Sequence, residues 1–426
     1  MGVAGGETEP QDTTYQPPPR AKRHGKALCL SGGGFRAALF HLGGLRRLNE
    51  VGLLSKLETI SSVSGGSVAN GFLAKVWPDL TKSLDAASGV FGKFAGVYEE
   101  PLRAFCSMDI RTGPLLWNRL DPRNWLTLMS HDHSATDFLS EAYRDHLVRD
   151  LRLGDLAAIQ AGGGPKFVID AANMQTGVSF TFTGEGIGDY KIGYASVPEL
   201  LVAEAVAASS SFTIAFPPLV LKLDETRFHG GSFERRAPRN ADLRKLRRRV
   251  VLSDGGVYDN LGLEPIWKTH ELVLCSDGGK PLDIQLDPGE SPLTRLMRAN
   301  SVIMNQVDAI RKRWLVAAYQ EKVYGGAYWG IGTEVTGYAT HGQGYGPAVL
   351  DRLRAVRTDF DSFSEDEQLV LMNHGWVLAD AALRTYVDAE CMKPIPAGSL
   401  PSPKLLGLDE ALKALEKSDQ TVWLGR

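Results

Sequence analysis

A serine between a predicted strand and a predicted helix is the first candidate for chemistry. Residues 59–63 form an apolar run typical of a buried strand, and residues 65–76 have helical spacing. Ser64 stands between them, where a sharp turn would expose its hydroxyl and the helix N-terminus would favour developing negative charge. The small neighbours that such an elbow requires are Ser62, Gly65 and Gly66. The usual pattern is G-x-S-x-G, so Ser62 departs from it. The pattern predicts a nucleophilic serine, with a helix cap or a phosphate-binding turn as the alternative.

Three consecutive glycines follow the predicted strand 26–30, and they are Gly32, Gly33 and Gly34. Without Cβ atoms, their amides can converge on one point, and beside a serine nucleophile they would form an oxyanion hole. A dinucleotide loop would need glycine at Ala37, and no Gly-Lys-Ser/Thr follows. Arg36 would either hold this loop in shape or meet a phosphate, and an ordinary surface arginine is the alternative.

An aspartate at a strand end supplies a candidate base. Asp254 follows the predicted strand 250–253 and precedes two glycines. Strand ends carry the chemistry of many α/β proteins, and a carboxylate there could accept a serine proton directly. Asp277 repeats the pattern one strand later. We favour Asp254 because its glycines lead into a polar loop and a new helix near Leu261, and we expect Asp277 to cap a turn.

The elements around these residues predict an α/β fold. Strand, helix, strand and helix succeed one another over residues 26–76, which favours a parallel central sheet. Residues 77–160 have no strand pattern and predict a helical insertion, either a lid or a second helical layer over the core. Further strands are predicted at 166–171, 178–183 (antiparallel to the preceding one), 250–253 and 271–275. Further helices are predicted at 198–208, 293–319 and 409–417. We divide the chain into a flexible tail (1–25), a catalytic domain (26–390) and a C-terminal extension (391–426).

Composition narrows the class of protein. The net charge of −3 argues against a nucleic-acid binder. The four cysteines form no CxxC pair, so we expect free thiols in a reducing compartment. Neither a signal-peptide pattern nor a run of 18 apolar residues occurs, so we expect a cytoplasmic protein that meets a membrane only peripherally. The sequence has no pattern of metal ligands, and the chemistry above needs no cofactor.

The ordered set of motifs resembles the patatin-like phospholipases. It comprises the glycine loop with Arg36, the Ser64 elbow and Asp254 with its glycines, and residues 31–38 also look like the animal cytosolic phospholipase. Residues 208–211 and the Phe-Pro-Pro at 216–218 are similar to further family motifs. The resemblance covers roughly residues 26–76 and 196–280. It implies a three-layer α/β/α fold with a mainly parallel central sheet.

The same resemblance implies roles for single residues. Ser64 would be the nucleophile and Asp254 the general base. The oxyanion hole would be formed by the amides of the glycine loop, Gly33 and Gly34 above all, and Arg36 would face the lipid phosphate. The protein would then be a serine-dependent lipid acyl hydrolase of phospholipase A, lysophospholipase or esterase type, with a lipid or ester as substrate.

Other functions stay open at this stage. An α/β-hydrolase with a Ser-His-Asp triad could use His270, His341 or His374, although only one predicted strand precedes that of Ser64. A non-catalytic binding protein would be expected to lose Ser64 or Asp254, and both are present. A lipase effector switched on by a small molecule or partner is the third alternative.

A basic segment precedes the strand of Asp254. Residues 235–249 hold eight Lys and Arg against one acid, Asp242. Such a cluster could attract an anionic lipid surface, at about 1 kcal/mol per basic residue. A solvated helix face is the alternative.

Overall fold

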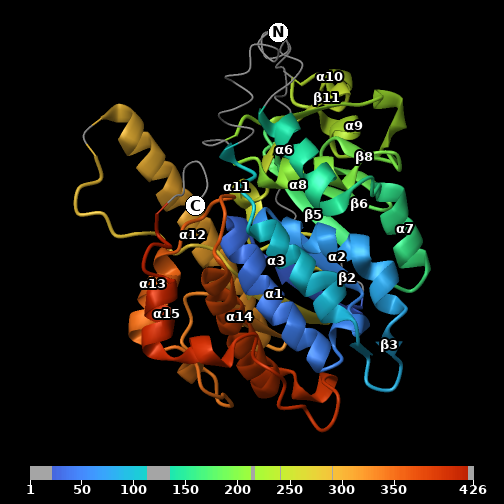
Figure 1. The fold of residues 1–426 in the computed structure, drawn as a ribbon. Coiled ribbons are helices and arrows are strands. Elements are labelled where there is room, and N and C mark those ends of the chain that lie inside the picture. The colour runs from blue at the N-terminus through green and yellow to red at the C-terminus, as the bar shows by residue number, and fades with distance from the viewer. Residues whose placement is uncertain (1–21, 113–134, 213–215, 240, 290, 421–426) are drawn as a thin grey trace, which may run out of the picture.

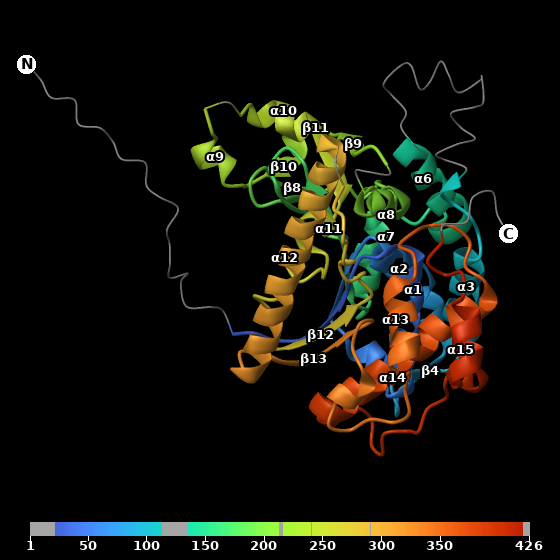
Figure 2. The ribbon, with the colours of Figure 1, turned by 90° about the vertical axis from the view of Figure 1, so that its left-hand side faces the viewer.

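A computed structural model describes residues 22–112, 135–212, 216–239, 241–289 and 291–420. Its centre is a mixed sheet with the strand order β10-β8-β7-β6-β5-β2-β1-β12-β13, beside which β11 pairs with both β5 and β9 (Figure 1). The five strands from β5 to β13 run parallel. Helices cover both faces, with α12 on one side and α1, α2 and α14 on the other (Figure 2). The expected three-layer α/β/α fold is confirmed.

The strands are β1 (Lys26–Leu30), β2 (Thr59–Val63), β3 (Leu84–Asp85), β4 (Val90–Phe91), β5 (Lys166–Asn173), β6 (Val178–Thr183), β7 (Gly186–Asp189), β8 (Gly193–Ala195), β9 (Leu219–Lys222), β10 (Phe228–His229), β11 (Arg249–Asp254), β12 (Leu272–Asp277) and β13 (Gly325–Gly330). The α-helices are α1 (Gly34–Glu50), α2 (Gly65–Thr81), α3 (Glu100–Cys106), α6 (Ala135–Tyr143), α7 (Leu153–Ala161), α8 (Val202–Ser210), α9 (Phe233–Arg236), α10 (Leu243–Arg248), α11 (Gly256–Asp259), α12 (Pro292–Gln320), α13 (Pro347–Ala355), α14 (Glu365–Tyr386) and α15 (Leu408–Ala414).

The central strands are apolar on both faces because each face is covered. Along β1, Leu28 and Leu30 belong to the large core under α1 and α14, whereas Ala27 and Cys29 belong to a smaller core under α12. This alternation follows from the two-residue period of a strand. All four cysteines are buried and free, as expected. No described helix has the length and hydropathy needed to cross a membrane.

The segment 77–160 is mostly helical where it is described. Its aromatic side chains Phe91, Phe94 and Phe105 are buried in the large core, which favours the interpretation as a covering layer over that of a lid. The expectation that it contains no strand is wrong, because β3 and β4 pair as a short hairpin. Part of the segment, with Trp117 and Trp125, lies outside the described residues, as does most of the expected tail 1–25.

The sequence prediction missed three regular elements after residue 320: β13, α13 and α14. β13 adds a fifth parallel strand beside β12, and α14 packs along α1. These helices approach so closely that a Cβ at Gly43 would lie 2.0 Å from the carbonyl oxygen of Met372. Beyond residue 390, Leu405, Ala411 and Leu415 join the same large core, so the boundary drawn there does not separate two cores.

Candidate active site

The elbow is a strained turn. Ser64 connects β2 to α2 with φ 50° and ψ −119°, a backbone conformation that is costly for a residue with a side chain. Its amide donates a hydrogen bond to Ser209 Oγ at 2.9 Å, at the end of α8. A Cβ at Gly65 would lie 1.9 Å from the carbonyl oxygen of Gly34. Close packing and a specific hydrogen bond therefore hold Ser64 in place.

Ser62, where the usual pattern has glycine, is part of a buried hydrogen-bond network. Its hydroxyl donates to the carbonyl oxygen of Val168 at 3.2 Å. Ser62 Oγ itself accepts hydrogen bonds from Ser67 Oγ at 3.0 Å and from Asn70 Nδ2 at 2.9 Å. The departure from glycine thus adds bonds that tie β2, α2 and β5 together beneath the elbow.

The pairing of β5 explains why Asp254 lies beside the elbow. β2 pairs with one edge of β5 up to Val63, which is opposite Asp170. β11 then takes over that edge in the antiparallel direction and ends with Asp254 opposite Ala171. The residue before Ser64 and Asp254 are thus in register with consecutive residues of one strand. At the end of β11, the Asp254 amide donates a hydrogen bond to the carbonyl oxygen of Ser211, the residue that follows α8.

Asp254 is buried and poised to titrate near neutral pH. Burial raises the pKa of its carboxyl from 3.8 to about 6. The hydrogen bond from the Gly256 amide, at 2.7 Å, and the nearby Ser64 side chain oppose that rise. A carboxylate with this pKa is ionised at neutral pH and basic enough to accept a hydroxyl proton.

The glycine loop lies in the same cavity as Ser64, and two of its amides are without a hydrogen-bond partner among the described residues. All three glycines line the cavity that holds Ser64. The amide of Gly32 donates to the carbonyl of Asn260 at 3.0 Å, so it is engaged, and we withdraw Gly32 from the expected oxyanion hole. Among the described residues, the amides of Gly33 and Gly34 donate no hydrogen bond. Gly34 has φ +61°, and a Cβ there would lie 2.5 Å from the carbonyl oxygen of Asp359.

Arg36 is completely buried, so it is not a surface arginine. Its guanidinium donates to the carbonyl of Gly278 at 2.8 and 3.1 Å and to that of Val356 at 2.9 Å. It is not among the residues that line the cavity. This geometry fits support of the glycine loop rather than contact with a lipid phosphate, the role implied by resemblance.

The cavity around Ser64 and Asp254 has a volume of about 440 Å³. Phe212, Phe216 and Phe360 give it apolar walls, whereas Arg111 and Asp359 form an ion pair in its lining. Its rim comes from segments that the motifs did not mark: Lys280, Pro281, Leu282, Asp283, Gln285, Arg298, Ser301, Met304, Asn305 and Asp308. Asn260 also lines the cavity. Its position six residues after Asp254 is the one signal in the sequence that could have marked a lining residue outside the motifs.

Asp277 lies in a different environment from Asp254. It ends β12, and Lys312 Nζ contacts its carboxylate at 2.5 Å while Tyr328 donates to it at 2.7 Å. Burial alone would raise the pKa of Asp277, but the charge of Lys312 and the hydrogen bonds from Lys312, Tyr328 and the Gly279 amide together lower it. It does not line the cavity, which is consistent with the preference for Asp254.

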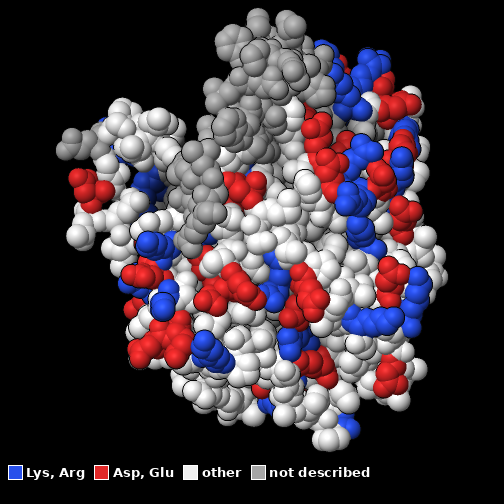
Figure 3. Space-filling model, in the orientation of Figure 1, with Lys and Arg blue, Asp and Glu red and all other residues white. Residues whose placement is uncertain are grey.

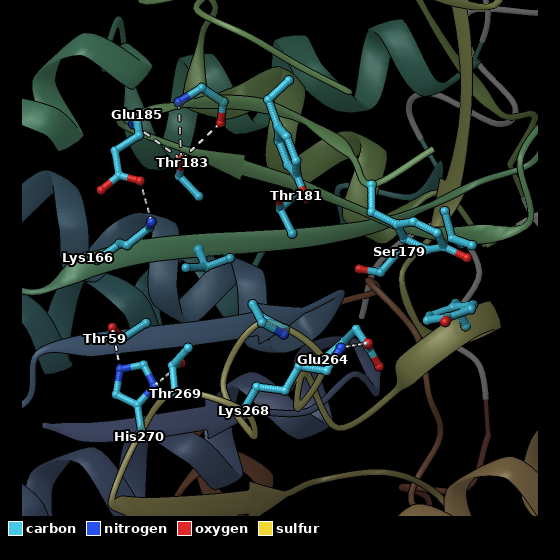
Figure 4. Close-up of a pocket in the computed structure, with 17 residues that line it drawn as sticks. Thr59, Lys166, Ser179, Thr181, Thr183, Glu185, Glu264, Lys268, Thr269 and His270 are labelled. Atoms are coloured by element: carbon cyan, nitrogen blue, oxygen red, sulfur yellow. Dashed lines mark hydrogen bonds and ion pairs between the residues drawn. The ribbon is translucent and has the colours of Figure 1, made fainter. Parts of the chain in front are cut away.

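The three histidines of the triad alternative lie elsewhere. None of His270, His341 and His374 lines the cavity of Ser64. His270 belongs to a separate cavity of about 700 Å³ against the polar face of β5 and β6, where its Nε2 lies 2.9 Å from Thr59 Oγ1 (Figure 4). His374 is buried, and burial lowers its pKa to about 4. The described residues contain no group of three or more His, Cys, Asp or Glu that could hold a metal ion.

The basic segment 235–249 lies away from this site. Arg249 begins β11 and Asp254 ends it, which separates them by roughly 17 Å along the strand. Arg247 is buried against the carbonyls of Ile192 and Gly230. The basic segment therefore lies at the end of β11 opposite Asp254, and its attraction to an anionic lipid surface stays a prediction.

Comparisons with known proteins identify the family of the chain. The sequence model of a family described as patatin-like phospholipase matches residues 28–267, more than half of the chain. The chain belongs to the patatin-like phospholipase family. The match spans the elbow, the glycine loop and Asp254 and ends before β12. No curated protein sequence matches the chain.

Several solved structures are similar at low identity. Human GIVD cytosolic phospholipase A2 is 12% identical over 92% of this chain and 63% of its own, with a TM-score of 0.44. VipD from Legionella pneumophila is 15% identical over 86% of this chain and 68% of its own, with a TM-score of 0.35. ExoU of the type III secretion system of Pseudomonas aeruginosa, in complex with SpcU, is 18% identical over 67% of this chain and 51% of its own, with a TM-score of 0.24. The chain spans less than two thirds of the human structure.

Proposed function

We propose that the protein is a serine-dependent lipid acyl hydrolase in which Ser64 is the nucleophile and Asp254 its general base. The observation that carries the proposal is that Ser64 and the buried Asp254 carboxyl line one cavity with the glycine loop, close enough for the Ser64 side chain to lower the pKa of Asp254. Membership of the patatin-like phospholipase family supports lipid hydrolysis.

The chemistry follows from this arrangement. Asp254 accepts the hydroxyl proton as Ser64 Oγ attacks the ester carbonyl, and the carbonyl oxygen becomes an oxyanion that the amides of Gly33 and Gly34 stabilise. Collapse of this intermediate breaks the ester bond, and Asp254 returns the proton to the leaving alcohol. Water then attacks the acyl-enzyme, Asp254 again takes the proton, and release of the fatty acid restores Ser64.

The cavity suits an acyl ester. Phe212 and Phe216 offer apolar walls for the start of an acyl chain close to Ser64. Phospholipase A, lysophospholipase and simple esterase activities share this requirement. The absence of His270, His341 and His374 from the cavity lining weighs against the triad mechanism.

A fluorophosphonate probe and a lipid panel test the proposal. We expect the probe to label the wild-type protein and mass spectrometry to detect fatty-acid release from at least one lipid ester. Ser64→Ala should lose both, because no other group can form the acyl-enzyme. Ser301→Ala, which removes another serine of the same cavity, is the matched control and should keep both. Labelling or hydrolysis that survives in Ser64→Ala would overturn the assignment.

A further inference from the structure

Only half of the long helix α12 packs on the protein body. Leu315 and Ala318, near its C-terminal end, are buried in the smaller core, and Lys312 pairs with Asp277. Trp314 packs edge-to-face on Trp267. The N-terminal half projects from the body, together with the chain segment that leads into it (Figures 1 and 2). We call residues 280–289 and 291–310 the projecting arm.

The projecting arm exposes large apolar side chains. Ile284 is 92% exposed, Leu296 67% and Ile303 59%. The complete set is Ile284, Leu286, Leu293, Leu296, Met297, Val302, Ile303 and Ile310. In the space-filling view the arm is predominantly white (Figure 3). So many exposed apolar side chains in one projection are unusual for a surface that meets only water.

The helical spacing places much of this apolar surface on one side. Leu296, Ile303 and Ile310 are seven residues apart, so they form a single stripe along the projecting half of α12. Nothing in the described chain covers this stripe. Where the helix reaches the body, its apolar side chains are instead buried at Leu315 and Ala318.

The arm is also a wall of the proposed active-site cavity. Leu282 and Met304, both within the arm, line the cavity together with Ser64. On α12, the cavity-lining Arg298, Ser301 and Asn305 lie on the side opposite the stripe. In the segment before α12, the exposed Ile284 and Leu286 flank Gln285, which lines the cavity. A surface that covers the arm therefore lies beside the cavity that holds Ser64.

We infer that the projecting arm docks on a lipid surface without net charge, such as a phosphatidylcholine bilayer, and delivers substrate from it to Ser64; this inference rests on the proposed function. A lipid surface beside the cavity would supply the ester that Ser64 attacks, whereas a second copy of the chain would supply no substrate. Residues 280–310 hold three basic and four acidic residues, so the arm has no charge complementary to an anionic membrane. Burial of apolar side chains would provide the binding energy.

Vesicle binding tests the inference without hydrolysis. Ser64→Ala protein is mixed with phosphatidylcholine vesicles, and the bound fraction is measured by flotation. The arm variant carries in addition Ile284→Ser, Leu286→Ser, Leu293→Ser and Leu296→Ser, none of which lines the cavity. We expect at least about tenfold weaker binding for this variant and little effect of added salt on the parent. Leu408→Ser, at an exposed leucine on α15 outside the arm, is the matched control and should bind as the parent does.

Activity separates this inference from the proposed function. With Ser64 restored, the arm variant should hydrolyse a soluble short-chain ester within about twofold of wild type but lose about tenfold or more on vesicles. Equal vesicle binding by arm variant and parent would overturn the docking surface even if both enzymes are active. A dimeric parent that becomes monomeric in the arm variant, with vesicle binding unchanged, would assign the stripe to a second copy. Vesicle binding that depends on the arm in a protein without hydrolytic activity would support docking and overturn the proposed function.

Discussion

Replacing Asp254 by asparagine should abolish hydrolysis and, at neutral pH, stabilise the fold. Burial raises the pKa of Asp254 from 3.8 to about 6, so the ionised form costs free energy in the folded protein. The shift of roughly 2 pKa units corresponds to about 3 kcal/mol at pH values above 6. Asparagine keeps the shape and can still accept the hydrogen bond from the Gly256 amide, but it bears no charge. The loss of activity should approach that of Ser64→Ala, because base and nucleophile act as one unit.

The predicted stabilisation by Asp254→Asn depends on pH. Between pH 4 and 6 the folded protein retains a proton on Asp254 that the unfolded chain has released, so the stabilisation by asparagine should grow as pH rises through this window. Above pH 6 it should be complete, and below about pH 4 it should vanish. For a chain of this length, about 3 kcal/mol corresponds to a rise in melting temperature of about 3 °C. Scanning calorimetry of wild type and variant at pH 4 and pH 8 measures it.

Asp277→Asn is the matched control because its expected sign is opposite. Lys312 lowers the pKa of Asp277, so the ionised form stabilises the fold and its loss should destabilise the protein at pH 8. That destabilisation should shrink as pH falls through the lowered pKa. An Asp254→Asn variant that melts below wild type at pH 8, or shows one shift at both pH values, would refute the reasoning about a buried, charged base.

Three further predictions concern the same site. For wild type, kcat/KM on a soluble ester should fall about tenfold per pH unit below about pH 6, because the protonated form of Asp254 cannot act as a base; a flat profile between pH 4 and 6 would contradict this. Gly33→Ala should lower the rate by roughly 100- to 1,000-fold through a displaced oxyanion donor, with circular dichroism to check the fold; near-normal kcat in a folded variant would exclude Gly33 from that role. Ser62→Gly, which restores the usual elbow pattern, should destabilise the fold by about 1–2 kcal/mol in chemical denaturation, because the donors of Ser67 and Asn70 lose a buried acceptor. An unchanged or raised stability in Ser62→Gly would show that the network contributes nothing.

The local motifs predicted the parallel strands and their turns because each signal lies within a few neighbouring residues. β1 and β2 have the bounds that the apolar runs indicate, and β6 pairs antiparallel to β5 as expected. β13 escaped because the glycines at 325, 326 and 330 interrupt the apolar pattern that marks a buried strand. Such an element is specified by its partner, β12, rather than by its own residues.

The structure brings Ser64, Asp254 and the glycine loop into one cavity, but the other residues that line this cavity could not be predicted from the sequence. Ser64 and the glycine loop follow the ends of the parallel strands β2 and β1, and Asp254 meets them because the antiparallel β11 ends on the same edge of β5 where β2 ends. Arg36 was ambiguous in the sequence, because burial and hydrogen bonding to Gly278 depend on distant segments. The cavity rim at 280–308 has no motif, since its role depends only on where α12 projects.

The separation of 190 residues between Ser64 and Asp254 is bridged by one strand. β5 pairs along one edge first with β2 and then with β11. The ends of these two strands are therefore opposite consecutive residues of β5, Asp170 and Ala171. Ser209 strengthens this junction, because its hydroxyl donates a hydrogen bond to the carbonyl of Asp170 at 2.6 Å and accepts one from the amide of Ser64. The relative position of nucleophile and base is therefore set by backbone pairing rather than by side-chain packing. It follows that changes at the cavity rim should alter substrate access while leaving the distance between the two catalytic groups unchanged.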